Sequence, residues 1–598
     1  MRMKLHLIVS VIPVLWVQCI AFQGPRPSLP LFAGPPQPLL SSRRRAARSQ
    51  ILQRSTAVKE GGEVPSSPAA PAAKVPVPSP LSPPPPPPSA SPRPQRNEVE
   101  IIRRFEQWAR EKARVMFQSV SHGYFLDSNR GKPALSLAAL QRCRGVKVNA
   151  DVKAGEALIA VPIDAAIVAT ANGTLPEELS GWLNAPYWKE ASLPVRLALK
   201  LLHEKEKGEA SEWAEYVAFL PPVGSFPTPL HWSDDELQKL KLGRMIEMVK
   251  RQREGWRGLH EDLLQRGLKD ASGGSLSWED FAWALEIVSS RAFAGNFTQT
   301  SPLLLGALQL AWAIAVAFAI VQLYTSSGQA DPPIPLIVAG GAAALLPGIA
   351  SSALEGRRGA DKGGSDLALV PVLDSVNHLT VSEAQFGYDG VKRAFTLTAD
   401  KDQGPGDQVF LNVGEKSNDY WLQYGGFVER RNPSDDFTLD VIGWVKRQPS
   451  PPPDDRFRLL ESTNMRRYLD SLQCLRNGLV PALEKAVTAL WILVGATQAE
   501  IRFVVDWIRN ANFRVVQGVS TATEIKAYET IEGAAQDMVA RLDPTDKERK
   551  EADSLRGMAR ERHELALKYR DEKVTLLRDV VKRCRNEKRF FQRSLQNK

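Results

Sequence analysis

The chain has 598 residues, a formal net charge of +10, four cysteines and 44 prolines. At roughly 150 residues per domain, this length allows two to four domains. Because 43% of the residues are hydrophobic and 24% are charged, most of the chain can bury a core, which excludes collagen-like, wholly disordered and polytopic membrane proteins. The cysteines form no CxxC pair and the seven histidines show no metal-ligand spacing, so we expect neither a disulfide scaffold nor a metal site.

The positive charge is concentrated at the front of the chain. Residues 1–59 contain nine Lys or Arg and no Asp or Glu, which leaves a net charge of only +1 for residues 60–598. The first 100 residues also hold 21 of the 44 prolines. A basic protein is a candidate for binding nucleic acid or an anionic membrane. Because the body of this chain is nearly neutral, we do not expect a nucleic-acid partner.

The front of the chain has the form of a two-part targeting sequence. In residues 1–21, a short basic start precedes the apolar run Leu5–Ile20, and small side chains suit signal-peptide cleavage after Ala21. Residues 22–59 are basic, contain several serines and lack acids, which is typical of a transit peptide. A signal peptide followed by a transit peptide that begins with phenylalanine, here Phe22, resembles the presequences of algae with secondary plastids. We therefore expect plastid targeting; the alternative is an ordinary secretory or ER protein.

Residues 60–96 have the composition of a linker. They are rich in Pro, Ala and Ser and include an unbroken proline run, Pro83–Pro88. Such a sequence favours extended polyproline II without a core. We interpret it as a spacer; the alternative is a ligand for an SH3-like domain.

From residue 97 onward the hydrophobic pattern indicates a folded body of mixed helices and strands. Apolar residues at helical spacing predict helices, alternation predicts strands, and Ser233 with Glu236 three residues later predicts a capping box. Beyond about Thr463 we expect nearly all of the chain to be helical. In chain order, the predicted elements are a helix over 98–117, two strands within 146–162 around a turn at Lys153–Gly155, helices over 193–204, from Ser233 and over 278–293, and strands over 394–398 and 408–413.

The chain carries none of the short motifs that identify an enzyme class on their own. It has no P-loop, no dinucleotide-type glycine loop after a strand, no HExxH and no nucleophile elbow. Composition and periodicity therefore indicate only a mixed strand-and-helix domain followed by a helical domain.

Six segments, taken in order, resemble one protein family. They begin with Arg144–Pro162 and end with Ala566–Lys573, within about 97–590. By this shared order the chain resembles the SET-domain protein lysine methyltransferases of the Rubisco large-subunit methyltransferase type. The segments between are Trp213–Pro222 with Pro227–Ser233, Ser290–Phe293, Val370–His378, and Gly406–Phe410 with Lys416–Asp419 and Gly426–Val428.

The resemblance implies a fold and an activity. The implied fold is α+β: a β-rich, knotted SET domain with a helical insert over 97–445, followed by an all-α substrate-binding domain over 455–598. The implied cofactor is S-adenosylmethionine, and the implied substrate is the lysine side chain of a protein, here a plastid protein. Methyl transfer is in line, so the enzyme contributes mainly by positioning the neutral amine against the methyl group. The charged helix over 547–593 is expected to dock the protein substrate, or else to be a solvated surface.

The resemblance also implies cofactor contacts, residue by residue. The Arg-Gly-Val turn matches the tight cofactor-binding turn, where the backbone must approach a ligand closely. Arg291, within the Ser290–Phe293 segment, matches the arginine that pairs with the methionine carboxylate. The plainer alternatives are a hairpin glycine and a surface salt bridge. The predicted cofactor-binding residues are Arg144, Gly145, Val146, Arg291, Asp374, Asn377 and His378.

Two positions depart from the family pattern. The family usually has a tyrosine beside the lysine channel where this chain has Val413, which has no hydroxyl to orient the amine. The second family tyrosine, just before Gly-Phe, corresponds to Gly425 without a gap and to Tyr424 with a shift of one residue. We expect Tyr424 or Tyr420 to take the catalytic role. The alternative is a catalytically weakened SET-fold module that binds or scaffolds other proteins.

A long apolar insertion interrupts the segments that resemble the family. Residues 301–324 and 334–354 carry no charge, and Asp331-Pro-Pro breaks the chain between them. Each stretch is long enough to cross a bilayer, so we expect a transmembrane hairpin over 301–354. The positive charges that follow would keep the SET domain on the stromal face of a plastid membrane. The alternative is an apolar flap buried against the protein or a partner.

Overall fold

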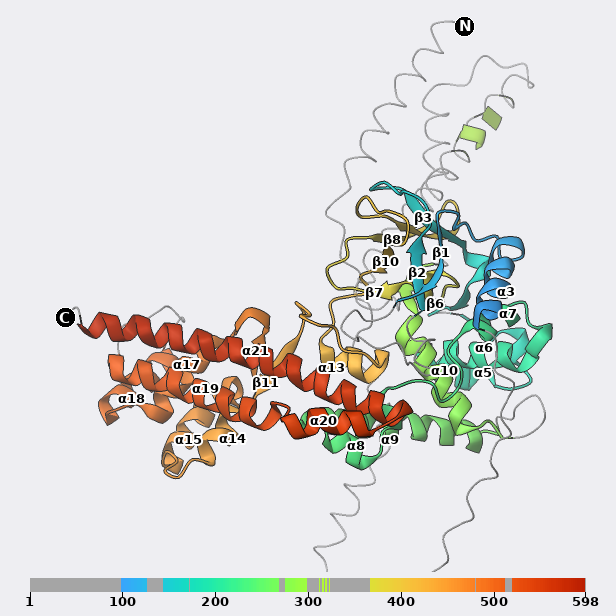
Figure 1. The fold of residues 1–598 in the computed structure, drawn as a ribbon. Helices are drawn as coiled ribbons and strands as arrows, with labels where there is room; N and C mark the ends of the chain where they lie inside the picture. Colours follow the sequence, from blue (N-terminus) through green and yellow to red (C-terminus); the bar gives the residue numbers. More distant parts are fainter. Residues whose placement is uncertain are drawn as a thin grey trace, which may run out of the picture. The chain divides into compact units, whose positions relative to one another are not determined.

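The computed structural model describes most of the chain beyond the predicted linker (Figure 1). Described residues from Ile102 onward form one compact unit, whereas residues 98–101 belong to another. The predicted signal peptide, transit peptide and linker lie outside the described residues, as does nearly all of the predicted hairpin over 301–354. Within the described part, no helix is both long enough and apolar enough for a bilayer crossing. The described residues are 98–125, 144–171, 173–267, 275–297, 366–478, 480–510, 519–596 and seven helical residues between Ala311 and Gln322.

A four-stranded sheet carries two of the predicted cofactor segments. Its strand order is β1-β2-β10-β7; the β10–β7 pair is parallel and the other pairs are antiparallel. Val146 and Val148 of β2 are buried while Lys147 between them is half-buried, as expected for a strand with one face on the core. The strands are β1 Val120–Tyr124, β2 Arg144–Val148, β7 Asn377–His378 and β10 Gln408–Leu411.

Two further sheets are three-stranded and antiparallel. Their strand orders are β3-β9-β8 and β4-β6-β5. Phe293 of β5 stacks on Phe386 of β8 with ring centroids 4.6 Å apart, so these two sheets share a core. The strands are β3 Ala157–Pro162, β4 Ile167–Ala169, β5 Phe293–Gly295, β6 Asp366–Leu369, β8 Gln385–Asp389 and β9 Ala394–Thr398.

Helices α6 and α10 form the centre of the helical packing in this part of the chain. They pack against each other, and α6 also contacts β4 and β6. Pro194 lies in the first turn of α6, and the helix ends at Gly208 with a φ of 55°, which a residue without Cβ adopts readily. The helices are α3 Glu98–Glu111, α5 Ala185–Glu190, α6 Leu193–Lys207, α7 Ala214–Phe219, α8 Asp234–Gln238, α9 Gly243–Gln265 and α10 Trp278–Arg291.

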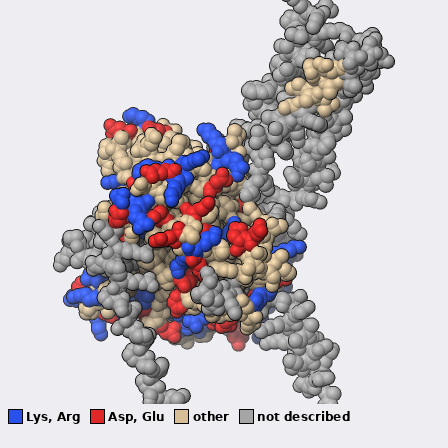
Figure 2. All heavy atoms as spheres, turned by 90° about the vertical axis from the view of Figure 1, so that its right-hand side faces the viewer, with Lys and Arg blue, Asp and Glu red and all other residues tan. Residues whose placement is uncertain are grey.

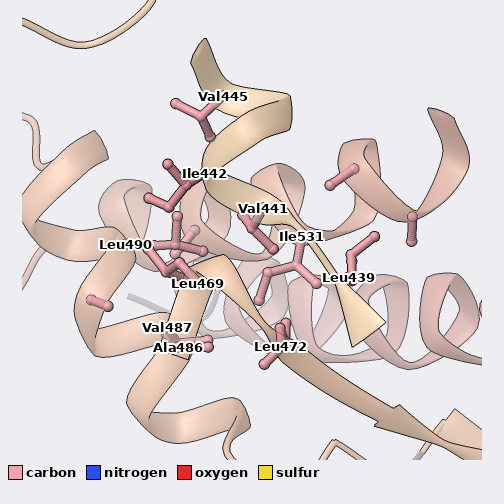
Figure 3. Close-up of a cluster of buried hydrophobic side chains, with 14 of the residues drawn as sticks. Leu439, Val441, Ile442, Val445, Leu469, Leu472, Ala486, Val487, Leu490 and Ile531 are labelled. Carbon is pink, nitrogen blue, oxygen red and sulfur yellow. The ribbon is translucent and has the colours of Figure 1, made fainter. Parts of the chain in front are cut away.

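The second half of the described chain is mainly helical and has an apolar core of its own. Figure 3 shows part of this core, where Ile442, Leu490 and Ile531 come from three different helices. The elements are α13 Asn418–Tyr420, the π-helical turn η6 Trp421–Gly425, β11 Asp436–Leu439, α14 Val441–Lys446, α15 Asp454–Ser462, α16 Arg467–Asp470, β12 Leu472–Leu475, α17 Leu483–Val494, α18 Gln498–Asn510, α19 Thr521–Leu542, α20 Asp546–Ser554 and α21 Gly557–Gln596.

The predicted α+β class is confirmed, and so is the predicted capping box. The side chain of Ser233 accepts a hydrogen bond from the N–H of Glu236 at 3.2 Å, and the Glu236 carboxylate accepts one from the N–H of Ser233 at 2.7 Å. The turn between the two predicted strands is present at Gly155, where a φ of 85° favours glycine. The knot implied for the SET domain stays a prediction.

Several predicted boundaries are wrong. The helix predicted over 98–117 ends at Glu111, because Arg114 takes a left-handed φ of 54° and the following residues turn into a β-bridge. Phe293, predicted to end a helix, begins β5. The strand predicted over 408–413 ends at Leu411. The stretch predicted to be helical beyond Thr463 contains the strand β12, which pairs with β11.

A buried ammonium group joins helix α21 to α13 and to the residue that directly precedes β11. Lys573 is 1% exposed, and its Nζ lies 2.7 Å from the carboxylate of Asp435 and 2.6 Å from that of Asp419. Burial alone lowers the pKa of Lys573, but the two carboxylates outweigh burial and raise it above its ordinary value. Asp435 also accepts hydrogen bonds from the backbone and side chain of Asn418. The Lys416–Asp419 segment is therefore fixed to α21 by charge-assisted hydrogen bonds.

One turn earlier on α21, a second buried base holds the preceding helix, α20, in place. The guanidinium of Arg570 is completely buried and forms two hydrogen bonds with the carboxylate of Glu548 on α20, at 2.9 and 3.0 Å. The hydrogen bond from Arg570 holds the pKa of Glu548 far below its ordinary value. The segment Ala566–Lys573, which carries part of the family resemblance, thus contributes two buried bases, Arg570 and Lys573, to the packing of α21.

We predict that Lys573→Ala lowers the free energy of unfolding by about 3–5 kcal/mol, because it leaves a buried carboxylate without its partner. Chemical denaturation followed by circular dichroism measures the change. Lys550→Ala on α20, which removes an exposed lysine, is the matched control and is expected to change stability by less than about 0.5 kcal/mol. Equal effects of the two substitutions would contradict a special role for the buried ammonium.

Candidate functional site

The segment that leads from β6 to β7 follows a tightly determined path. Val372 is completely buried and has a left-handed φ of 69°, which a β-branched residue rarely adopts. A strained residue of this kind persists only where the surrounding contacts determine its conformation, and such residues concentrate at functional sites. The segment carries Asp374, Asn377 and His378, three of the predicted cofactor-binding residues.

Gly145 on β2 lies against Asn377 on β7. The Nδ2 of Asn377 donates a hydrogen bond to the carbonyl oxygen of Arg144 at 3.1 Å. A Cβ added to Gly145 would lie 2.7 Å from that Nδ2 and 2.8 Å from Nε2 of Gln408, closer than real Cβ contacts. The position requires glycine because two polar side chains approach its backbone. The structure thus brings two predicted cofactor segments together, while their role in holding the cofactor stays a prediction.

The side chains on both sides of Gly145 hold β2 in the core. The Nη2 of Arg144 donates to the carbonyl oxygen of Phe219 at 2.7 Å, and its guanidinium lies 4.1 Å from the centroid of the Phe219 ring. Val146 is completely buried. Any contact that these two residues make with a cofactor therefore comes from their backbone.

Arg291, at the end of α10, lies next to Asp374. Its Nη1 donates a hydrogen bond to the backbone carbonyl oxygen of Asp374 at 2.9 Å. The Asp374 carboxylate is buried and accepts a hydrogen bond from the hydroxyl of Tyr216 at 2.6 Å. Burial raises the pKa of Asp374, although Arg291 and Tyr216 oppose the shift, and burial beside Asp374 raises the pKa of Tyr216 well above 10. The Asp374 side chain is thus engaged inside the protein, and it fixes the segment that leads to Asn377.

His378 is held from both sides of its ring. Its Nδ1 accepts a hydrogen bond from the backbone N–H of Val413 at 3.2 Å, so the ring proton is on Nε2, which faces Thr380 Oγ1 at 3.1 Å. Thr380 in turn donates to Glu429 at 2.6 Å. Burial alone raises the pKa of Glu429, but hydrogen bonds from His378 and Thr380 outweigh burial and hold it below its ordinary value. Val413 therefore contributes its backbone N–H to this network.

The two predicted catalytic tyrosines lie side by side on α13 and η6. The ring centroids of Tyr420 and Tyr424 are 4.9 Å apart, and Trp421 between them in sequence packs 4.2 Å from the ring of His378. Burial raises the pKa of both hydroxyls, to about 12 for Tyr424, so both are neutral at physiological pH. The π-helical turn that carries Tyr424 is a rare element that often occurs at functional sites. Which tyrosine contacts a substrate stays a prediction.

Sequence reasoning did not single out Tyr216, Trp421 or Glu429. The indole N–H of Trp421 is buried and has no acceptor among the described residues. All three residues lie in or beside segments that carry the family resemblance. Neither periodicity nor spacing distinguishes a tyrosine that bonds a buried carboxylate from an ordinary core aromatic, so no sequence signal could have found Tyr216.

We predict that Glu429→Gln removes a pH-dependent part of the stability. A carboxyl group whose pKa is lowered by folding stabilises the folded state above its ordinary value of 4.5, and this contribution is lost as the pH falls below that value. At pH 7 the variant should be less stable than the parent by about 1–3 kcal/mol. The difference should shrink between pH 5 and 3, measured as urea midpoints. If the stability difference between the variant and the parent stayed the same between pH 5 and 3, the result would contradict this hydrogen-bond network.

Sequence comparison identifies two relatives, although no protein-family model matches the chain. The SET domain-containing protein 4 of Artemia parthenogenetica is 22% identical over 368 residues, which cover 60% of this chain and 75% of that protein. The chloroplastic fructose-bisphosphate aldolase-lysine N-methyltransferase of Arabidopsis thaliana is 27% identical over 204 residues, 33% of this chain. The match spans only 36% of the length of the Arabidopsis enzyme.

Solved structures similar to this one include Rubisco LSMT bound to AdoMet and the SET domain of LSMT bound to lysine and AdoHcy. The identities are 16% and 17%, and each comparison covers 82% of this chain and 93% of the other, with a TM-score of 0.48. The chain is thus similar in sequence to a SET domain-containing protein and to a lysine N-methyltransferase, and its ordered segments between Arg144 and Lys573 resemble the SET-domain methyltransferases.

Proposed function

We propose that the chain is an S-adenosylmethionine-dependent protein-lysine N-methyltransferase that acts on a plastid protein. The observation that carries this proposal is the contact between Gly145 on β2 and Asn377 on β7, which joins two segments that separately resemble the family's cofactor face. The proposal includes a SET domain over 97–445 and a helical substrate-binding domain over 455–598. One of the sequence relatives is a lysine N-methyltransferase by name.

Residues that contact the Asp374–His378 segment fit an amino-acid and nucleoside ligand. Arg291 uses one nitrogen for the Asp374 carbonyl, so the rest of its planar fork can bind a carboxylate. The buried indole N–H of Trp421, without an acceptor in the described residues, suits an acceptor atom on a ligand. When bound, S-adenosylmethionine supplies an electrophilic methyl group. Gly145 and Asn377 would hold it through backbone and amide groups.

The aromatic cluster of Tyr420, Trp421 and Tyr424 beside His378 is suited to bind the lysine side chain that accepts the methyl group. A lysine ammonium must release one proton to water before its nitrogen can attack, and desolvation favours the neutral amine. A lysine of the chain itself shows this effect of desolvation beside the same cluster. Burial lowers the pKa of Lys416, whose Nζ lies 5.5 Å from the ring centroid of Tyr420. The neutral hydroxyls of Tyr420 and Tyr424 can accept hydrogen bonds from an amine and so orient its lone pair.

A protein-binding module on the same fold, without catalysis, is the second candidate function. The observation that favours it is Val413, where the family usually has a tyrosine. In this chain the Val413 backbone still bonds to His378, so the local geometry is retained without the hydroxyl. The two functions differ in methyl transfer but share binding of the donor.

We predict that the full-length protein transfers a labelled methyl group from S-adenosylmethionine to lysines of plastid proteins. Tyr424→Phe is expected to lower the rate of transfer by about 10- to 100-fold without weakening donor binding, because it removes an orienting hydroxyl. Asn377→Ala is expected to weaken donor binding itself. Calorimetry measures binding and radiolabel incorporation measures transfer, with Tyr528→Phe on α19 as the matched control.

The outcomes separate the two candidate functions. Donor binding without transfer would support the non-catalytic module, especially if Val413→Tyr produced transfer. An absence of donor binding in the full-length protein would contradict both. If Tyr420→Phe reduced transfer and Tyr424→Phe did not, the catalytic role would belong to Tyr420.

We also propose that the protein is directed to a secondary plastid and attached to a plastid membrane by the hairpin over 301–354. Plastid location is supported by the composition of residues 1–59 and by the chloroplastic relative in Arabidopsis. Membrane attachment rests on the two uncharged stretches of the sequence. It has the buried apolar flap as its alternative.

We predict that a full-length fluorescent fusion expressed in an alga with a secondary plastid locates to that plastid and stays in the membrane pellet after carbonate washing. Retention in the secretory system would contradict the targeting proposal. Release into the supernatant would contradict the hairpin but leave the location unaffected. Deletion of residues 301–362 is the control, and it should yield a plastid protein that carbonate releases.

A further inference from the structure

A groove between α19 and α21 is lined by none of the residues assigned above to the methyl donor or to the reacting amine. Its volume is about 560 Å³. The two helices lie side by side (Figure 1), and they run antiparallel, because Asp543 pairs with Arg578 while Tyr528 stacks on Phe591. Two antiparallel helices form a trough into which a third helix can pack.

One wall of the groove is strongly basic. Arg578, Lys582, Arg585 and Arg589 lie at helical spacing along one face of α21, and none of the described residues that line the groove is Asp or Glu. With a rise of about 1.5 Å per residue, the four charges extend over roughly 16 Å, or three helical turns. Elsewhere on the molecule acidic and basic side chains are interspersed, as on the face in Figure 2.

The four bases divide into two kinds. Arg585 forms an ion pair with Glu532 of α19 at 2.8 Å, and Arg578 forms one with Asp543, the residue that caps α19, at 2.5 Å, so both join the two helices. Lys582 and Arg589 are exposed and make no ion pair or hydrogen bond within the described part of the chain. These two charges are therefore available to a ligand.

The groove also has an apolar lining. Val539 and Ala540 of α19 and Val581 of α21 line it, together with the uncharged polar residues Gln536 and Asn586. A ligand that satisfies both features needs negative charge along one edge and apolar side chains along the other. A flat membrane surface does not enter a trough between helices, and the groove offers no described aromatic side chain on which a nucleic-acid base could stack.

We propose that this groove binds an acidic, amphipathic helix of a partner protein, about three turns long. Glutamate or aspartate side chains of that helix pair with Lys582 and Arg589, and its apolar side chains cover Val539, Ala540 and Val581. The proposal does not depend on methyl transfer, since it concerns binding at a surface of the helical half of the chain.

The test is fluorescence anisotropy of a labelled 16-residue amphipathic peptide, with glutamate on one helical face and leucine on the other, titrated with the full-length protein. We expect saturable binding that the double substitution Lys582→Glu/Arg589→Glu weakens by about tenfold or more. The matched control is Lys547→Glu/Lys550→Glu on α20, which makes the same change in net charge at exposed lysines outside the groove. The control should bind like the parent, and circular dichroism should show both double variants to be folded.

Several results would overturn the proposal. They are failure of the parent to bind the peptide, equal weakening by the groove and control substitutions, and equal binding of a peptide of the same composition with scrambled order. Failure of the parent to bind the peptide, combined with binding of anionic phosphatidylglycerol vesicles or of polyuridylate that only the groove substitutions weaken, would instead assign the surface to a membrane or to RNA. If the groove variant failed to fold, Lys582→Gln/Arg589→Gln would repeat the comparison.

Discussion

The buried ammonium of Lys573 is the interaction on which the arrangement of the candidate site depends. It lies between the carboxylates of Asp435 and Asp419, and Asp419 directly precedes Tyr420. A buried charge must keep its partners, so the position of α21 determines the position of α13. Tyr569, one turn earlier, adds a hydrogen bond to Asp419 at 2.8 Å. The helical half of the chain thus supports the aromatic cluster directly, besides forming an apolar core of its own.

The same half of the molecule combines two kinds of charge. Lys573 and Arg570 are buried and fully paired, and they serve the structure. Lys582 and Arg589 lie further along the same helix, exposed beside the apolar lining of the groove. A sequence count treats all four as positive residues of one charged helix. Only the packing of α21 in the folded protein distinguishes the buried charges that stabilise the structure from the exposed charges that can bind a partner.

Much of the fold could be predicted from the sequence, because strong periodicity and cap residues act locally. The Ser233 capping box and the glycine turn at Gly155 are examples. The contact between Gly145 and Asn377 could not be predicted, since it depends on the register that places β7 beside β10 and β10 beside β2. The four-residue strand β12 gives too short an alternation to be recognised between helices. The hydrogen bond from the backbone of Val413 to His378 could not be predicted either, because every residue except proline carries the same backbone N–H.

The central claim is that the methyl donor binds where Gly145 of β2 meets Asn377 of β7. Hydrogen exchange measured by mass spectrometry, with and without S-adenosylhomocysteine, tests this claim most directly. The account predicts slower exchange in peptides that cover 144–148 and 374–378 when the ligand is present, and unchanged exchange in α19. Unchanged exchange in both segments at a saturating ligand concentration, or protection confined to other parts of the chain, would contradict it.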